Sequence, residues 1–165
     1  MNRQQISISD ILNAYKIDKR IGIICNYIDS APADADPLYI RSLSYSAKAI
    51  ALAACGKKSL FICAEKDEAP YVYYDLTKII GEEKAFLLPS SFKHRPDATA
   101  FDAQNIQLRT EAISKLLDPS VKELVLITTP QAVTEKVISS SELKQNTLNV
   151  KVGEHISLSF LTEVL

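Results

Sequence analysis

The chain has 165 residues, a formal net charge of −1 and a hydrophobic content of 47%. This composition is typical of a soluble globular domain with a core, and it argues against a dedicated nucleic-acid binder, which is usually basic. No segment approaches the about 20 apolar residues that a membrane helix needs, and the start MNRQQISISD lacks the apolar core of a signal peptide. We therefore expect a cytoplasmic protein without a membrane partner.

The three cysteines, Cys25, Cys55 and Cys63, are odd in number and include no CxxC pair. In a cytoplasmic protein such a set is more often buried and reduced than joined in disulfides. The sequence therefore predicts three buried thiols.

The first 28 residues contain one helical pattern, over 7–17, followed by a short apolar run, IGIIC, at 21–25. The stretch DSAPADADP at 29–37 is rich in Pro, Ala and Asp, as linkers and exposed loops are. We expect residues 1–28 to be an appendage, joined by the linker 29–37 to the main domain.

A strand–helix alternation begins after the linker. Strands are expected at 38–42, 59–64, 84–88 and 123–128, and helices at 46–55, 68–80, 102–117 and 130–138. Asp67 and Gly81 are placed to begin and end the second of these helices, and Thr129-Pro130 to begin the last. Because the strand runs are continuously apolar, they predict strands covered on both faces. The fold class is therefore α/β, with a parallel sheet flanked by helices.

The end of the chain, LNVKVGEHISLSFLTEVL, offers a strand, a turn at Gly153 and the opening of a helix. Its last residues are apolar, which is unusual at a natural terminus. We expect 38–147 to be the main domain and 148–165 to be the start of a following domain that is cut short.

A phosphate-binding P-loop has the pattern GxxxxGK[ST], and only Lys48 stands in a comparable place, between an apolar run and a helix. With Lys48 as the P-loop lysine, Ser42 and Ala47 replace the two glycines, and Ala49 replaces the hydroxyl residue that holds Mg²⁺. A left-handed backbone at Ala47 would cost about 1–2 kcal/mol. The sequence predicts a P-loop-like architecture with a degenerate nucleotide site, and no catalytic residue, cofactor or metal ligand.

Other chemistry-bearing residues favour structural roles. His94 and His155 are far apart in the sequence and belong to no ligand motif. Cys63 at a strand end is more typical of a core residue than of a reactive thiol, although α/β active sites collect at such ends. Carboxylates at 65, 67 and 68 favour helix capping over a metal site, and packing accounts for the tyrosines at 71, 73 and 74.

The segment 90–104 is a long loop that carries Lys93, His94 and Arg95, which could meet a phosphate or an acidic partner or could be solvated. Arg109 lies on the apolar stripe of the following helix. Its guanidinium is expected either to reach the protein surface or to pair with a buried carboxylate or carbonyl.

Five segments together resemble the N-terminal, UvrB-like module of the bacterial transcription-repair coupling factor family, Mfd. They are SLSYSAKAIALAACGKKSLFICAEKDEA, KAFLLPSSF, NIQLRTEAISKLL, VLITTPQAVTEKV and LNVKVGEHISLSFLTEVL. The resemblance covers residues 38–165 and rests on order, spacing and hydrophobic pattern. The family's proline-tyrosine-aspartate and serine-proline-histidine signatures are absent, and FKHRPDATAFDAQ stands in their place.

The resemblance implies a non-catalytic scaffold in a multidomain DNA translocase that displaces stalled RNA polymerase and recruits UvrA. ATP and Mg²⁺ would act in downstream motor domains, and downstream domains would also bind DNA and RNA polymerase. In the family, the UvrA contact lies mainly in the domain that follows this one.

Two other readings remain open from the residues. One is a nucleotide-binding enzyme that holds an anion with Lys48 and the helix start near Ser46. The other is a receiver-like or flavodoxin-like binding module, since strand–helix alternations carry many functions.

Overall fold

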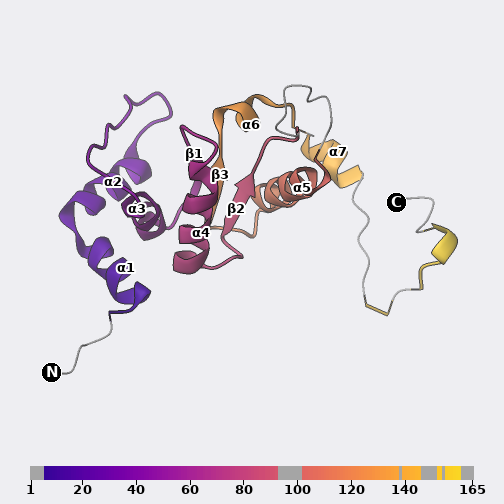
Figure 1. The fold of residues 1–165 in the computed structure, drawn as a ribbon, viewed down its shortest axis with the longest axis horizontal. Coiled ribbons are helices and arrows are strands. Elements are labelled where there is room, and N and C mark those ends of the chain that lie inside the picture. Colours follow the sequence, from indigo (N-terminus) through magenta and orange to yellow (C-terminus); the bar gives the residue numbers. More distant parts are fainter. Residues whose placement is uncertain (1–5, 93–101, 138, 146–151, 154, 161–165) are drawn as a thin grey trace. The chain divides into compact units, whose positions relative to one another are not determined.

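The computed structural model describes residues 6–92, 102–137, 139–145, 152–153 and 155–160 (Figure 1). The chain divides into two compact units, Met1–Glu135 and Lys136–Leu165. The first unit holds the sheet, and the second holds the short helix α7 (Ser140–Gln145). In the part of the chain that is described, no helix is both long and apolar enough to cross a membrane.

The sheet has three parallel strands in the order β1-β3-β2: β1 (Lys58–Ile62), β3 (Leu124–Thr128) and β2 (Ala85–Leu88). Each lies within two residues of the range predicted for it, and the α/β class with a parallel sheet is confirmed. The central strand β3 is buried at all five positions, as expected for a strand covered on both faces.

The strand predicted at 38–42 is wrong, because these residues pair with no strand in the described residues. The backbone at Ser42 has a φ of 66°, which ends an extended run. The Tyr27 hydroxyl donates to the Asp36 carbonyl, and Ile40 lines the same hollow as Ile24. The segment is therefore held beside α2 (Lys19–Ser30), which competes with pairing to the sheet.

Helices cover the two faces of the sheet unequally. Helix α4 (Glu68–Ile80) packs on β2 and β3 from one face, and α5 (Ala103–Leu117) packs on β2 from the other (Figure 1). On the α5 face of β1, Leu60 is 51% and Ile62 49% exposed. The prediction that every strand is covered on both faces is therefore wrong for β1, which lies at the edge of the sheet. Helix α5 packs mainly on β2, and β1 reaches the end of α5 through the side chain of Lys58.

Small side chains let α3 (Ala47–Cys55) pack closely on α4 above the sheet. Ala49 and Ala53 of α3 join Val72 and Leu76 of α4 in one cluster. The cluster also includes Cys63, Ala69, Ala85, Val125 and Ile127. This cluster is the core that fixes the start of α3, and with it the position of Lys48.

Capping residues set the helix boundaries largely as predicted. Helix α4 ends at Gly81, whose φ is 93°. The side chain of Thr129 accepts from the Ala132 amide at the start of α6 (Pro130–Thr134), which is shorter than the predicted 130–138. Asp67 stands at the N-cap of α4, but its side chain makes no capping hydrogen bond.

The N-terminal helices belong to the same compact unit as the sheet. Helix α1 (Ile8–Ile17) begins with a capping box of Ser7 and Asp10 and packs on α2, α3 and α4. Helix α2 contains the predicted apolar run and buries Ile21. The domain boundaries at 28, 37 and 147 stay predictions.

Near the chain end, Gly153 lies in a turn with a φ of 94°, and residues 158–160 form a helical turn. The strand expected just before Gly153 falls mainly on 146–151, which lie outside the described residues.

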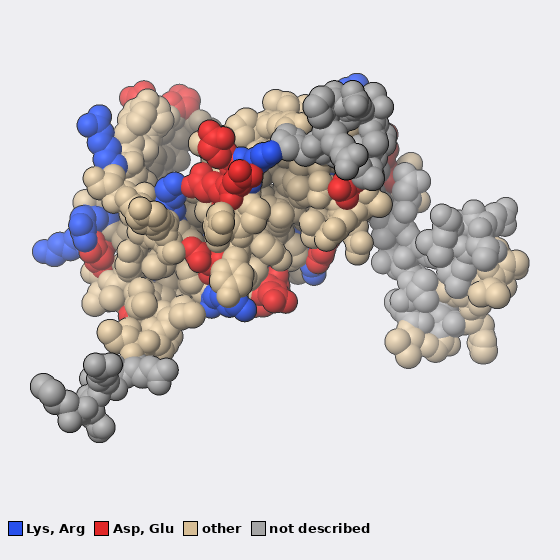
Figure 2. Space-filling view, in the orientation of Figure 1, with Lys and Arg blue, Asp and Glu red and all other residues tan. Residues whose placement is uncertain are grey.

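Charged side chains of both signs are interspersed on the face of the protein in Figure 2. Lysine and arginine side chains lie beside aspartate and glutamate side chains over α3 and α4. The described residues of this face therefore form no continuous basic stripe of the kind that follows a nucleic-acid backbone.

Candidate functional site at the Lys48 loop

The loop that leads into α3 is held in an unusual backbone conformation. Ser42 and Tyr45 have φ values of 66° and 51°, and they are the non-glycine residues with positive φ in the described chain. Ala47 instead begins α3 with ordinary helical geometry. Ser42, which the comparison with the P-loop pattern sets at the first glycine, thus has the positive φ that favours glycine, whereas Ala47 carries none of the strain of a left-handed residue.

Lys48 is committed to a partner within the chain. Its Nζ lies 2.6 Å from Oε1 of Glu68 at the start of α4, with side chains 37% and 28% exposed. A phosphate that approached Lys48 would have to displace this carboxylate or be repelled by it. Glu68, expected as a helix-capping residue, is instead the counter-ion of Lys48.

The position after Lys48 faces the interior. Ala49 is 1% exposed and belongs to the core cluster, whereas a P-loop hydroxyl at this point would face the metal. Within the described ranges, no group of three or more His, Cys, Asp or Glu side chains is arranged to hold a metal ion.

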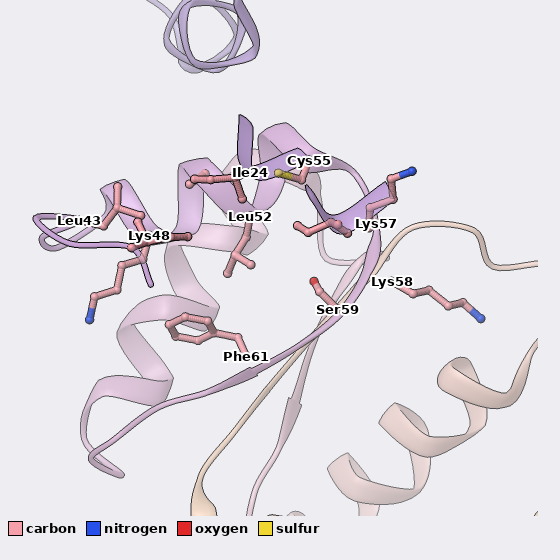
Figure 3. A pocket seen from close by; sticks show the side chains of 12 residues that line it. Ile24, Leu43, Lys48, Leu52, Cys55, Lys57, Lys58, Ser59 and Phe61 are labelled. Atoms are coloured by element: carbon pink, nitrogen blue, oxygen red, sulfur yellow. The ribbon is translucent and has the colours of Figure 1, made fainter. Parts of the chain in front are cut away.

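An apolar hollow of about 430 Å³ lies on one side of Lys48, between α2, α3 and β1. Leu52 of α3 and Ser59 and Phe61 of β1 surround it, and the amines of Lys57 and Lys58 point outward (Figure 3). Lys57 pairs with Asp29 at 2.5 Å, and Lys58 donates to the carbonyls of residues 116 and 118. With its cations engaged elsewhere, this hollow offers aliphatic contact and little to a charged ligand.

A disulfide between Cys25 and Cys55 joins α2 to the end of α3 beside this hollow, with Cα atoms 5.3 Å apart. The prediction of three reduced thiols is wrong for this pair, because the packing of α2 on α3 brings two distant cysteines together. No signal in the sequence points to the pairing.

Cys63 is the free cysteine of the described chain and is 1% exposed. Burial, and secondarily the charge of Glu68, raises the pKa of its thiol to about 11. A thiol that stays protonated at neutral pH is a poor nucleophile, so Cys63 acts as a small core residue, as the sequence favoured.

Arg109 is 5% exposed and binds groups of its own chain at the carboxyl end of the sheet. Its Nη1 donates to the Pro89 carbonyl at 2.7 Å and to the Ala132 carbonyl at 3.2 Å, and lies 3.5 Å from Glu135 Oε2. The expected pairing with a buried carboxylate or carbonyl is present in both forms. Arg109 thereby ties α5 to the residues that follow β2 and β3.

The basic residues of the long loop, Lys93, His94 and Arg95, lie outside the described residues, so their proposed contact with a partner stays a prediction. At the end of this loop, the side chain of Asp102 accepts from the amides of Gln104 and Asn105 at the start of α5.

Comparison with known proteins adds no relative: the chain matches no protein-family model, no curated protein and no solved structure.

Proposed function

We propose that this chain is a non-catalytic scaffold and protein-interaction module of a transcription-repair coupling factor. Its sheet and Lys48 loop would be a P-loop-like, UvrB-related frame that has lost nucleotide binding. The whole protein would act in the cytoplasm as a DNA translocase that displaces stalled RNA polymerase and recruits UvrA. ATP, Mg²⁺, DNA and RNA polymerase would engage its motor domains, and UvrA the domain that follows this one.

The observation that carries the proposal is the state of Lys48. The lysine stands at the start of α3, where a P-loop would use it on phosphate, but Glu68 neutralises it at 2.6 Å. The neighbouring Ala49 is buried and has no hydroxyl to offer a metal. The parallel sheet and the left-handed backbone at Ser42 support descent from a nucleotide-binding frame, whereas residues 38–42, where a P-loop would have its strand, add none to the sheet.

Thermal unfolding with ATP and Mg²⁺ tests the loss of nucleotide binding. A ligand at 100 times its Kd stabilises a protein by about 2.7 kcal/mol, which is a clear rise in Tm. We expect no rise with millimolar ATP and Mg²⁺. A rise that Lys48→Met abolishes would overturn the scaffold proposal.

Capture of UvrA tests the interaction role. A chain that continues through the following domain is expected to retain purified UvrA on a column, and the chain that ends at Leu165 is expected not to. Failure of the longer chain to retain UvrA would contradict the assignment to the coupling-factor family.

A nucleotide-binding enzyme is the second candidate, and the backbone at Ser42 favours it. Its φ of 66° is the conformation that lets loop amides turn toward a phosphate, and Lys48 follows at P-loop spacing. In that case Glu68 would have to swing away from Lys48 when the anion binds. The Lys48→Met comparison above separates the two candidates.

A further inference from the structure

A second hollow, of about 640 Å³, lies on the other side of Lys48, between the 43–46 loop and α4. Three tyrosines line it, and each is largely exposed: Tyr45 at 93%, Tyr71 at 75% and Tyr74 at 62%. Tyr73, by contrast, packs against the core. Packing therefore accounts for one tyrosine of the 71–74 group and leaves the other two unexplained.

The backbone also holds Tyr45 in this place at a cost. A φ of 51° is rare for a bulky residue, because an L side chain is less stable there than in an ordinary conformation. Strain of this kind persists where the surrounding structure imposes it, and it clusters at binding sites. Here the residue in the strained conformation lines the hollow and keeps its side chain exposed.

The wall of the hollow carries two carboxylates, and Lys48 pairs with one of them. Glu68 on its wall is neutralised by Lys48. Asp75, one helical turn beyond Tyr71, is half-buried on the same wall, and its carboxylate makes no hydrogen bond or ion pair in the described chain. A cation is therefore the complementary occupant.

We propose that this hollow binds an arginine side chain of a partner protein. A guanidinium stacks on tyrosine rings and bonds a carboxylate with two parallel N–H groups, while Leu43 and Val72 would contact its aliphatic stem. Lys78 Nζ lies 5.3 Å from the ring centre of Tyr74, so this ring already has a cation–π contact within the chain, and Tyr45 and Tyr71 are the rings left for the guanidinium.

The exposure of the tyrosines points to a protein rather than a small molecule as the source of the arginine. A small ligand would leave most of a ring that is 93% exposed in contact with water, whereas a partner surface would cover it. Tyrosine and arginine are the residues enriched at the centres of protein interfaces. This inference rests on the proposed function only in that the chain acts by binding a protein.

An NMR titration of the ¹⁵N-labelled chain tests the site. The probe is the peptide acetyl-Gly-Arg-Gly-amide, and the control probe carries citrulline, which has the same shape without the charge. We expect saturable shifts of the amides of Tyr45, Tyr71, Tyr74 and Asp75 with the arginine peptide, and an affinity about tenfold lower with citrulline.

Matched variants distinguish specific binding in the hollow from nonspecific electrostatic attraction. Asp75→Asn and Tyr71→Ala are each expected to lower the affinity for the arginine peptide about tenfold. Glu111→Gln removes the same charge from an exposed position on α5 and should leave the affinity for the arginine peptide unchanged. The Tm of all three variants should equal that of the native chain. Equal binding of citrulline, equal weakening by Glu111→Gln, or shifts confined to other residues would overturn the arginine site. UvrA capture and the ATP measurement do not depend on this titration, so its failure would leave the proposed function standing.

Discussion

Glu135 shows how a single carboxylate can hold the carboxyl end of the sheet together. It accepts hydrogen bonds from the Ser90 hydroxyl at 2.5 Å and the Ser91 amide at 2.9 Å, and it faces Arg109. Burial raises the pKa of this carboxyl, but the hydrogen bonds from both serines and the charge of Arg109 outweigh it, so that the pKa lies below its usual value. The ionised carboxylate therefore stabilises the folded chain.

Glu135→Gln is expected to lower the free energy of unfolding by about 2 kcal/mol at pH 7, because Arg109 loses its counter-ion. A group whose pKa is lowered by folding adds stability above its unfolded pKa, near 4.5 here, and loses it as the pH falls through the lower folded value. The difference between variant and native chain should therefore shrink at pH 3. Urea unfolding at both pH values measures it, and an equal difference at both would contradict the assigned ionisation.

The sequence could predict Arg109's surroundings but not those of Lys48. An arginine within an apolar stripe must find a carboxylate or carbonyl, whatever the fold, because burying it alone costs too much. The partner of Lys48, Glu68, depends on how closely α3 packs on α4, and no local pattern encodes that distance. For the same reason the unpaired Asp75 could not be recognised from the sequence.

At the level of whole elements, helices α1, α3, α4 and α5 and all three strands were predictable, because apolar residues recur at helical spacing in most of these helices and form continuous runs in the strands. The segment at 38–42 has the composition of a strand, yet composition does not supply a pairing partner. A strand exists only where another backbone meets it, and here residues 36–40 lie against α2 instead.

Reduction of the Cys25–Cys55 disulfide is expected to destabilise the first unit by about 3 kcal/mol, since the bond closes a loop between cysteines 30 positions apart in the sequence. Urea unfolding with and without dithiothreitol measures the effect. Cys25→Ser provides the control, because reductant should not change its stability. If dithiothreitol also leaves the stability of the native chain unchanged, the disulfide does not contribute to the free energy of unfolding.

For the molecule as a whole, the core cluster lies entirely within Met1–Glu135. A chain that ends at residue 137 should therefore keep the fold of the first unit and unfold at the same Tm as the full chain. Circular dichroism during heating makes the comparison. A drop of more than a few degrees would mean that Lys136–Leu165 contributes to the stability of the sheet.

In the described residues β1 pairs with β3 alone, so its outer edge is open, and Leu60 and Ile62 beside it are half exposed. This open edge affects how the chain behaves at high concentration. Unpaired amides and carbonyls beside aliphatic side chains are a template on which a second copy can form an intermolecular sheet. Concentrated samples should therefore self-associate, and Leu60→Lys should keep them monomeric in sedimentation velocity runs. Equal self-association of the native chain and the variant would mean that copies associate through a surface other than β1.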